Sequence, residues 1–413
     1  MLRPRDLIAG PGRAVAVLSL TQILGWGILI YPPVLMMPLI AADRGWSLAF
    51  CMGGLSVALA TSGLLSPTSC GLIDRYGGNR VMSLGALTGM TGMIGLLFAE
   101  QWQVYLLCWL LIGAAMSSTL YDPAFTTLTR IFGASARRQI TFVTFAGGFA
   151  STVSWPATHV LLAHFGWRGT YVVFAVVLGL VIAPLHAFAL PRAAPDAPPL
   201  AQASGAPATA AFLPSRGWPF VLLAAAFACH AFLLSGVTSN LLAMLERGGI
   251  DSATVVMVGA LFGPAQVMAR LGDFTFARKT SPLWVARVAV VCMVTAFTAL
   301  ALAGISVVVA GLFCILFGAA NGVMTIARGA LPLAMFGPVG YGRVIGRIAR
   351  PALLLQASAP FAVAAVAQRL SDKTVLEFGA IGAVVALSCL LALRLPSAPP
   401  RSRFAEADSP DND

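Results

Sequence analysis

The sequence predicts an all-α, polytopic membrane protein, and three observations support this fold class. Of the 413 residues, 58% are hydrophobic and only 10% are charged, and the mean hydropathy is +0.87. Apolar runs repeatedly exceed the roughly 18 residues that a helix needs to cross a bilayer. Residues 172–190 and 288–309 are apolar on nearly every face, whereas the strands of a membrane barrel alternate between apolar and polar residues. We therefore expect bundled membrane-spanning helices.

The apolar runs, with the loop residues between them, predict twelve spans. Their ranges are about 14–40, 47–67, 81–98, 104–131, 141–164, 170–189, 219–245, 253–269, 283–303, 307–336, 344–367 and 375–393. The spans form an N-terminal six-helix half at 1–190 and a C-terminal six-helix half at 218–395. Residues 191–217 between them are rich in Pro and Ala, which is typical of a flexible linker. We expect residues 396–413 to be a disordered tail.

Basic residues determine the predicted orientation. With both termini in the cytoplasm, that side collects 20 of the 26 Lys and Arg residues, and the outer loops keep only Arg44, Arg168, Arg247, Arg369 and Lys373. An excess of basic residues in short loops marks the cytoplasmic side of a membrane protein. The net charge of +11 follows from this topology, so it implies no nucleic-acid partner. We expect a multi-pass protein of the plasma membrane, in a bacterial inner membrane.

The two halves resemble each other at a spacing near 200 residues. Four matches occur in order along the chain: residues 43–45 with 246–248, Asp74 with Asp273, Gly113 with Gly318, and Trp155-Pro156 with Ala359-Pro360. Because six helices separate the copies, both have the same orientation and are related by a pseudo-two-fold axis along the membrane normal. Such a duplication places a substrate at the interface between the halves, near the midplane.

A short charged segment, GLIDRYGGNR at residues 71–80, lies between the second and third spans. Together with twelve spans in six plus six and a long central loop, it resembles the major facilitator superfamily, whose signature at this position is G-x-x-x-D-R-x-G-x-x-R/K. Gly166-Trp167-Arg168 and the Gly- or Pro-bearing spans five and eleven are similar to the monocarboxylate and oxalate/formate porter branches. The resemblance implies the superfamily fold and solute transport by alternating access.

The resemblance also implies a conformational latch in this loop. In the superfamily the loop holds the two halves together in one state, which assigns that role here to Gly71, Asp74, Arg75, Gly77 and Arg80. These residue types suit the role, because glycines permit a tight turn and a carboxylate stabilises a helix end. The second copy is degenerate and contributes Asp273 and Lys279. The alternative is an ordinary charged loop.

Two charged residues lie near the middle of predicted spans, Asp122 in the fourth and Arg328 in the tenth. At 1.5 Å per residue, each is roughly 14–17 Å from the inner end of its helix, near the middle of a ~30 Å core. A membrane aspartate costs roughly 2.5–3.5 kcal/mol, so it is expected to face water or a partner charge. We hypothesise that Arg328 attracts an anionic group and that Asp122 exchanges the coupling proton. A static ion pair and a snorkelling arginine are the alternatives.

Neutral polar residues complete the candidate site. Helical spacing places Ser118, Asp122, Thr126 and Thr129 on one face of span four, and Asn321, Thr325 and Arg328 on one face of span ten. His230 in span seven has a side chain suited to a proton step. The other candidates for substrate binding are Tyr121, Gln22, Trp26, Tyr31, Asn240, Gln266 and Gln356. Hydrogen bonding between helices is an equally good interpretation for each of them singly. Arg270 is expected at the cytoplasmic end of span eight.

The sequence contains no P-loop, HExxH or G-x-S-x-G motif, and its seven cysteines are scattered singly without CxxC spacing. We therefore expect no enzyme, no cofactor and no metal site. The leading interpretation is a proton-coupled secondary carrier of a small, anionic organic solute, acting as a monomer in the lipid bilayer. The transport alternative is proton-driven efflux of toxic or amphipathic compounds. The alternative of another class is a non-transporting membrane sensor or assembly factor.

Overall fold

A computed structural model of the chain describes residues 11–191, 217–276 and 280–396, and these ranges contain helices and no strand. Ten stretches of them are long and apolar enough to cross a membrane. One stretch, Trp102–Ala189, has 88 residues and contains the fourth, fifth and sixth predicted spans, so the ten stretches account for all twelve. Most of the predicted linker, the predicted tail and Lys279 lie outside the described residues.

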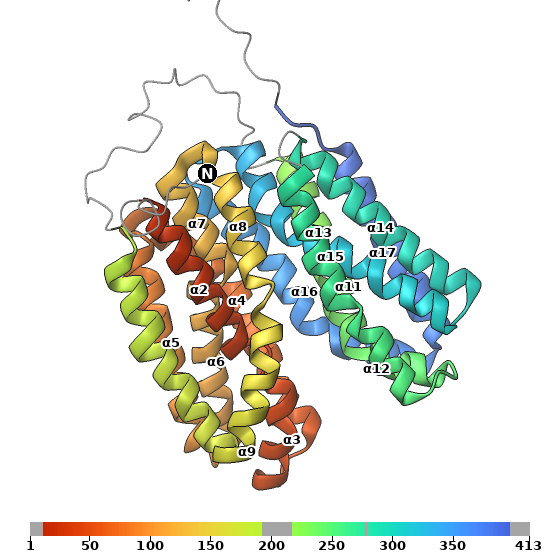
Figure 1. Cartoon of the computed structure of the whole chain (residues 1–413), viewed down its shortest axis with the longest axis horizontal. Coiled ribbons are helices and arrows are strands. Elements are labelled where there is room, and N and C mark those ends of the chain that lie inside the picture. Colours follow the sequence, from red (N-terminus) through yellow and green to blue (C-terminus); the bar gives the residue numbers. More distant parts are fainter. Residues whose placement is uncertain (1–10, 192–216, 277–279, 397–413) are drawn as a thin grey trace, which may run out of the picture.

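The N-terminal group of helices runs from α2 to η3 (Figure 1). Its elements are α2 (Pro11–Leu29), α3 (Pro33–Arg44), α4 (Leu48–Tyr76), α5 (Gly78–Leu97), α6 (Trp102–Thr119), α7 (Tyr121–Phe132), the short η1 (Gly133–Ala136), α8 (Arg137–Gly147), α9 (Ala150–Val176), and the π-helical η2 (Val177–Ile182) and η3 (Leu185–Ala189).

The C-terminal group runs from α11 to α17. Its elements are α11 (Trp218–Arg247), α12 (Ser252–Ala260), α13 (Phe262–Phe276), α14 (Pro282–Ala303), α15 (Val307–Phe336), α16 (Tyr341–Arg369) and α17 (Asp372–Ala392). Serine or aspartate caps start many of the helices, because their side-chain oxygens accept a bond from an unpaired backbone N–H of the first turn. Ser47, Asp251, Ser281, Ser306 and Ser371 have this role.

Several predicted spans consist of two helices. Pro32 and Pro33 separate α2 from α3, and Gly166, with φ +62°, bends the chain between the fifth and sixth spans. Leu120 is extended between α6 and α7. The predicted common face of Ser118 and Asp122 is therefore wrong, since helical spacing does not continue across this break. Ser118 bonds Ser69 of α4 instead, whereas Asp122 contacts the C-terminal group.

The buried apolar side chains form three clusters. One contains only residues of the C-terminal group, and a second only residues of the N-terminal group. The third lies mainly in the N-terminal group but includes Leu333, Tyr341 and Ile345 of α15 and α16. Apolar packing between the groups is thus concentrated where α15 ends and α16 begins.

We call that end of the bundle, with residues 74–78 and 337–343, the latch end, and the opposite end, with residues 43–46 and 247–251, the far end. The ribbons of the two groups lie close together at the latch end, near α7 and α8, and diverge toward α3 and α12 (Figure 1). The most extensive contact between the groups is α4 against α16, where a Cβ added to Gly346 would overlap the backbone of Ser66 and Pro67.

The internal repeat is visible in equivalent close contacts. A Cβ added to Gly113 of α6 would overlap the Ala58 carbonyl of α4, and a Cβ added to Gly318 of α15 would overlap the Phe262 carbonyl of α13. The two glycines that the sequence aligned therefore have the same packing role, each inside its own group. Only a residue without a side chain allows helices to approach this closely.

Candidate functional site

The centre of the candidate site is an ion pair between the two groups of helices. Arg328 Nη2 on α15 lies 2.6 Å from Asp122 Oδ2 on α7. Asp122 is 7% exposed, and its other oxygen, Oδ1, has no hydrogen-bond partner in the described part of the chain. The Arg328 side chain is 22% exposed. The pair joins the groups and leaves one carboxylate oxygen free to accept a proton.

A second guanidinium, from Arg270, lies in the same region. The sequence placed it at the end of a span, but α13 continues for six residues beyond it, so Arg270 lies inside the helix and is 5% exposed. Its nitrogens donate to uncharged acceptors at 3.1–3.5 Å, namely the carbonyls of Gly322 and Thr144, Gln266 Oε1 and Thr325 Oγ1. Among the described carboxylates, none forms an ion pair with Arg270.

The Arg270 side chain also crosses between the groups, because Thr144 belongs to α8 of the N-terminal group. Two consecutive glycines at the end of α8 make room for it. A Cβ added to Gly148 would overlap Arg270 Nη1, and a Cβ added to Gly147 would overlap the Tyr121 hydroxyl. The Tyr121 hydroxyl lies within electrostatic range of Arg270. Two guanidiniums thus reach across the contact between the groups, Arg270 from α13 to α8 and Arg328 from α15 to α7.

On the C-terminal side, a chain of polar contacts leads from Arg270 to His230. Thr325 Oγ1, an acceptor for Arg270, donates to the Asn321 carbonyl at 2.8 Å. The Asn321 Oδ1 atom lies 3.2 Å from His230 Nε2. His230 is 8% exposed, and its Nδ1 atom has no partner among the described residues. Four predicted site residues, His230, Asn321, Thr325 and Gln266, are therefore connected to Arg270, which the sequence analysis left out.

On the N-terminal side, aromatic and amide groups surround Tyr121. Its ring centroid lies 4.8 Å from that of Trp26, and Trp26 Nε1 donates to Gln22 Oε1 at 3.2 Å. Gln22 is fully buried and its Nε2 donates to the Thr119 carbonyl. Tyr31 lies within electrostatic range of Arg270 and contacts Trp155, with 6.3 Å between ring centroids. Gln22 thus orients Trp26, and Trp26 packs against Tyr121.

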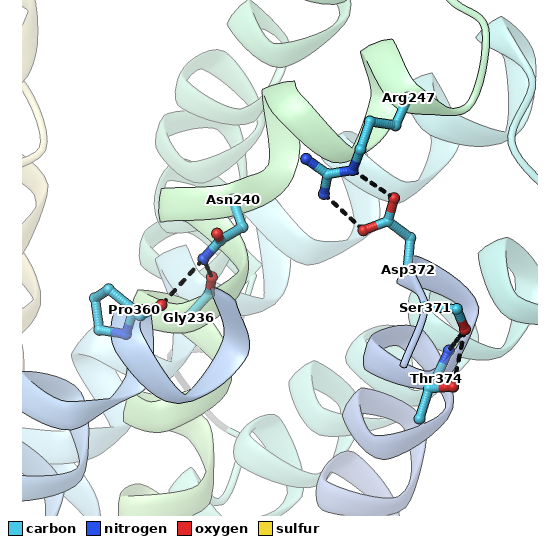
Figure 2. A network of polar contacts seen from close by, with 7 residues as sticks. All are labelled: Gly236, Asn240, Arg247, Pro360, Ser371, Asp372 and Thr374. Atoms are coloured by element: carbon cyan, nitrogen blue, oxygen red, sulfur yellow. Dashed lines mark hydrogen bonds and ion pairs between the residues drawn. The ribbon is translucent and has the colours of Figure 1, made fainter. Parts of the chain in front are cut away.

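Two predicted site residues lie apart from this cluster. Asn240 is ten residues beyond His230 on α11, which corresponds to roughly 15 Å along the helix. It donates to the carbonyls of Gly236 and Pro360, close to the Arg247–Asp372 ion pair (Figure 2). The backbone carbonyl of Gln356 accepts a bond from Ser235, and no contact connects its side chain to Arg270 or Arg328.

The predicted latch residue with the clearest contacts is Asp74. Its two carboxylate oxygens accept bonds at 3.1 Å from the backbone N–H groups of Gly342 and Arg343 in the first turn of α16. A carboxylate at this position neutralises the positive end of the helix dipole. Arg130 of α7 donates to the backbone carbonyl of Asp74. Asp74 therefore holds α4 and α16 together across the two groups.

The other latch residues are placed less tightly. Gly77, with φ +86°, makes the turn after α4, and Gly71 contacts the Arg343 side chain. Arg75 stacks over the Tyr76 ring at 5.0 Å, and Arg80 is exposed. In the second copy, Asp273 lies within electrostatic range of Arg137, which begins α8, and Arg137 also donates to the Thr280 carbonyl at 2.8 Å. Both copies thus face the start of a helix from the opposite group.

The Major Facilitator Superfamily profile matches residues 15–349, which is more than half of the chain. The chain belongs to the Major Facilitator Superfamily. Monocarboxylate transporter 11 from Homo sapiens is 31% identical over 163 residues, covering 38% of this chain and 32% of that protein. The Mus musculus protein of the same name is 30% identical over 168 residues, covering 38% and 35%. The match therefore spans about a third of the length of these relatives.

Solved structures of this superfamily have the same fold. The human organic anion transporter MFSD10 superposes with a TM-score of 0.72 at 17% identity, covering 92% of this chain and 100% of that one. The proton:xylose symporter XylE superposes with a TM-score of 0.70 at 10% identity, covering 92% and 96%. The transporter FucP superposes with a TM-score of 0.69 at 12% identity, covering 91% and 97%. Twelve spans in the superfamily fold agree with the fold class expected from the sequence.

Proposed function

We propose that this superfamily member carries a small organic anion by alternating access, driven by a proton gradient. The observation that carries the proposal is the charge balance at the contact between the groups: Asp122 pairs with Arg328, whereas the buried Arg270 donates only to uncharged acceptors and has no carboxylate of its own among the described residues. An excess of positive charge attracts a carboxylate and repels an organic cation. This balance favours anion transport over efflux of cationic compounds. The relatives named as monocarboxylate and organic anion transporters are consistent with the same substrate class.

Arg270 is the group that we assign to the anion. A buried charge with only neutral partners is costly, and an arriving carboxylate would supply the missing opposite charge. Bidentate, charge-assisted hydrogen bonds from a guanidinium to a carboxylate are stronger than bonds to neutral oxygens. The carboxylate would compete with the Thr144 carbonyl for Nη1. Because Thr144 lies on α8, losing that bond loosens the N-terminal group from the C-terminal group.

Asp122 and Arg328 are the groups that we assign to proton coupling. Protonation of Asp122 removes the negative charge that holds Arg328 at 2.6 Å. The released guanidinium is then a second positive group for the substrate. This ion pair also joins the two groups of helices. A proton on Asp122 weakens the Asp122–Arg328 contact, and an anion at Arg270 weakens the Arg270–Thr144 contact, so each ligand loosens the interface between the groups. A ligand changes a conformational equilibrium through such a difference in contacts between the two states.

The state described here is, in this proposal, outward-facing. The basic loops assign the latch end to the cytoplasm. Asp74 binds the start of α16 there, and Asp273 faces the start of α8, which keeps that side closed. The far end, where the groups diverge in Figure 1, is then the outer side. Substrate and proton would reach Arg270 and Asp122 from outside.

A thermal-shift screen of the purified full chain against carboxylates and organic cations, at two pH values, tests the substrate class. We expect carboxylates to stabilise the protein, and Arg270→Gln to lower the binding and uptake of the selected anion at least about tenfold, because a hydrogen bond to a charged group contributes about 1.5–3 kcal/mol. Arg138→Gln removes an exposed arginine from the first turn of α8 and should leave both unchanged. Stabilisation by cations alone would refute the anion assignment, and full uptake by Arg270→Gln would remove Arg270 from this role.

Proton coupling is tested separately with Asp122→Asn in proteoliposomes. The amide keeps the shape of the side chain but does not ionise, so we expect anion exchange between the two sides to persist. Accumulation driven by an imposed pH gradient should be lost. The measurement is uptake of labelled anion with and without the gradient. An unchanged response to the gradient would contradict the assignment of the proton to Asp122.

A further inference from the structure

An apolar groove lies on the surface of the N-terminal group, outside the candidate site. Its volume is about 410 Å³, and it is lined by Arg13 of α2 and by Leu180, Val181, Pro184, Leu185, Phe188 and Ala189. Leu180 and Phe188 are 70% and 74% exposed. Because these residues belong to a stretch that is apolar enough to cross a membrane, their exposed surfaces contact lipid.

The local backbone explains why a groove forms here. Residues Val177–Ile182 and Leu185–Ala189 are π-helical, on either side of the interval that contains Pro184. A proline has no N–H to donate, and a π-helical turn contains an extra residue, so the side chains on this face are spaced unlike those of a regular α-helix. The result is an apolar furrow that follows the helix axis over about two turns.

One end of the groove is cationic. Arg13 lies in the first turn of α2, is half-buried, and its Nε atom has no hydrogen-bond partner in the part of the chain that the structure describes. Ala14 shares a buried cluster with Leu190, so the start of α2 lies beside the end of η3. Leu180 is nine residues before Ala189, roughly 14 Å along the helix and deeper in the membrane.

We propose that this groove binds an anionic phospholipid of the surrounding leaflet. Arg13 holds the phosphate, and an acyl chain lies along Leu185, Phe188 and Leu180. A ligand with a negative head and a long apolar body matches a site with one cationic end and an otherwise apolar wall. The proposal is independent of what the protein transports, because no lining residue belongs to the candidate site.

Native mass spectrometry of the full chain, titrated with phosphatidylglycerol or phosphatidylcholine of the same acyl chains, tests the proposal. We expect one phosphatidylglycerol to bind about tenfold more tightly than phosphatidylcholine, because the choline cation next to the phosphate of phosphatidylcholine is repelled by Arg13, and we expect Arg13→Gln to remove that preference. Arg13→Lys should keep most of the preference. Arg138→Gln, the matched loss of an exposed arginine at the start of another helix, should keep all of it.

A second variant tests the apolar wall while leaving Arg13 in place. Val181→Trp fills the groove and should weaken phosphatidylglycerol binding about as much as Arg13→Gln does. Equal binding of the two lipids by the unmodified protein would overturn the proposal, as would undiminished phosphatidylglycerol binding by both variants. Displacement of the lipid by inorganic phosphate at equal concentration would assign Arg13 to a free anion instead, which also overturns it.

Discussion

The two ends of the helix bundle use their charged residues differently. At the latch end, Asp74 of the N-terminal group binds the first turn of α16, and Asp273 of the C-terminal group faces Arg137 of α8. At the far end, the bidentate ion pairs stay within a group, Asp43 with Arg168 and Arg247 with Asp372 (Figure 2). Contacts between the groups must break when the state changes, whereas contacts within a group move with it.

The largest change in the population of the state closed at the latch end is expected from Gly346→Ala. The added Cβ would overlap the α4 backbone at Ser66 and Pro67, which no side-chain rotation relieves. Overpacking of this kind costs roughly 1–3 kcal/mol, so the population of the state closed at the latch end should fall about tenfold. Distances between spin labels on α4 and α16, measured by pulsed electron paramagnetic resonance, report this change.

Two glycine variants serve as controls for Gly346→Ala. Gly113→Ala creates the same kind of overlap inside the N-terminal group, at the Ala58 carbonyl, and should lower the melting temperature without moving the labels. Gly53 has nothing within 4 Å of an added Cβ, so Gly53→Ala should change neither the melting temperature nor the label distances. Label distances that respond equally to Gly346→Ala and Gly113→Ala would contradict the distinction between the two kinds of contact.

Asp74→Asn is also expected to lower the population of the state closed at the latch end, but by less than Gly346→Ala does. The amide retains one acceptor oxygen but loses the negative charge at the start of α16, a contribution of about 0.3–1 kcal/mol at an exposed helix end and up to ~2 kcal/mol when partly buried. The closed population should fall by a few-fold in the same label measurement.

Asp251→Asn is the matched control for Asp74→Asn. Asp251 caps α12 by accepting a bond from Thr254 N–H at 3.0 Å, entirely within the C-terminal group. Its loss should affect thermal stability alone. If Asp74→Asn left the label distances unchanged, Asp74 would be an ordinary cap and not a latch.

The sequence predicted matching depths for Asp122 and Arg328, which form an ion pair, but it placed Arg270 at the end of a helix that continues past it; one physical reason accounts for both outcomes. Asp122 and Arg328 lie far inside long apolar runs, so counting residues from the helix ends located both. Arg270 follows soon after the last strongly apolar residues of its span, and a hydropathy pattern ends a span at such a charge. The acceptors that allow α13 to continue past Arg270 include the Thr144 carbonyl, 126 residues away, which is near only after folding. The spacing of Gln266 and Arg270, four residues apart on one helix face, was the available signal.

The break at Leu120 shows a second limit of the sequence. Residues 104–131 were predicted as one span, although Pro123 lies in it and a proline is best tolerated in the first turn of a helix, which is where α7 begins. The proline signals a break near this position but does not give which residue is extended. Ser118 contacts α4 and Asp122 contacts Arg328, so the two residues do not share the face that one continuous helix would have given them. By contrast, the repeat alignment of Gly113 with Gly318 was confirmed, because close helix packing depends on the local backbone and leaves its mark in the sequence.

Substitutions in the ion pairs of the far end are expected to have the smallest effect on stability. The partners in each ion pair are 125 residues apart in the chain, but the carboxylate comes first in one group and the guanidinium first in the other. Exposed pairs contribute about 0–1 kcal/mol, so Arg247→Gln should lower the melting temperature slightly and leave the label distances unchanged. Combining Arg247→Asp with Asp372→Arg copies the order found in the N-terminal group and should restore the melting temperature. In the repeat alignment Arg247 corresponds to Arg44 and not to Asp43, so the two ion pairs join equivalent loops through neighbouring positions. A double variant less stable than Arg247→Gln would show that the surroundings of each pair also select its order.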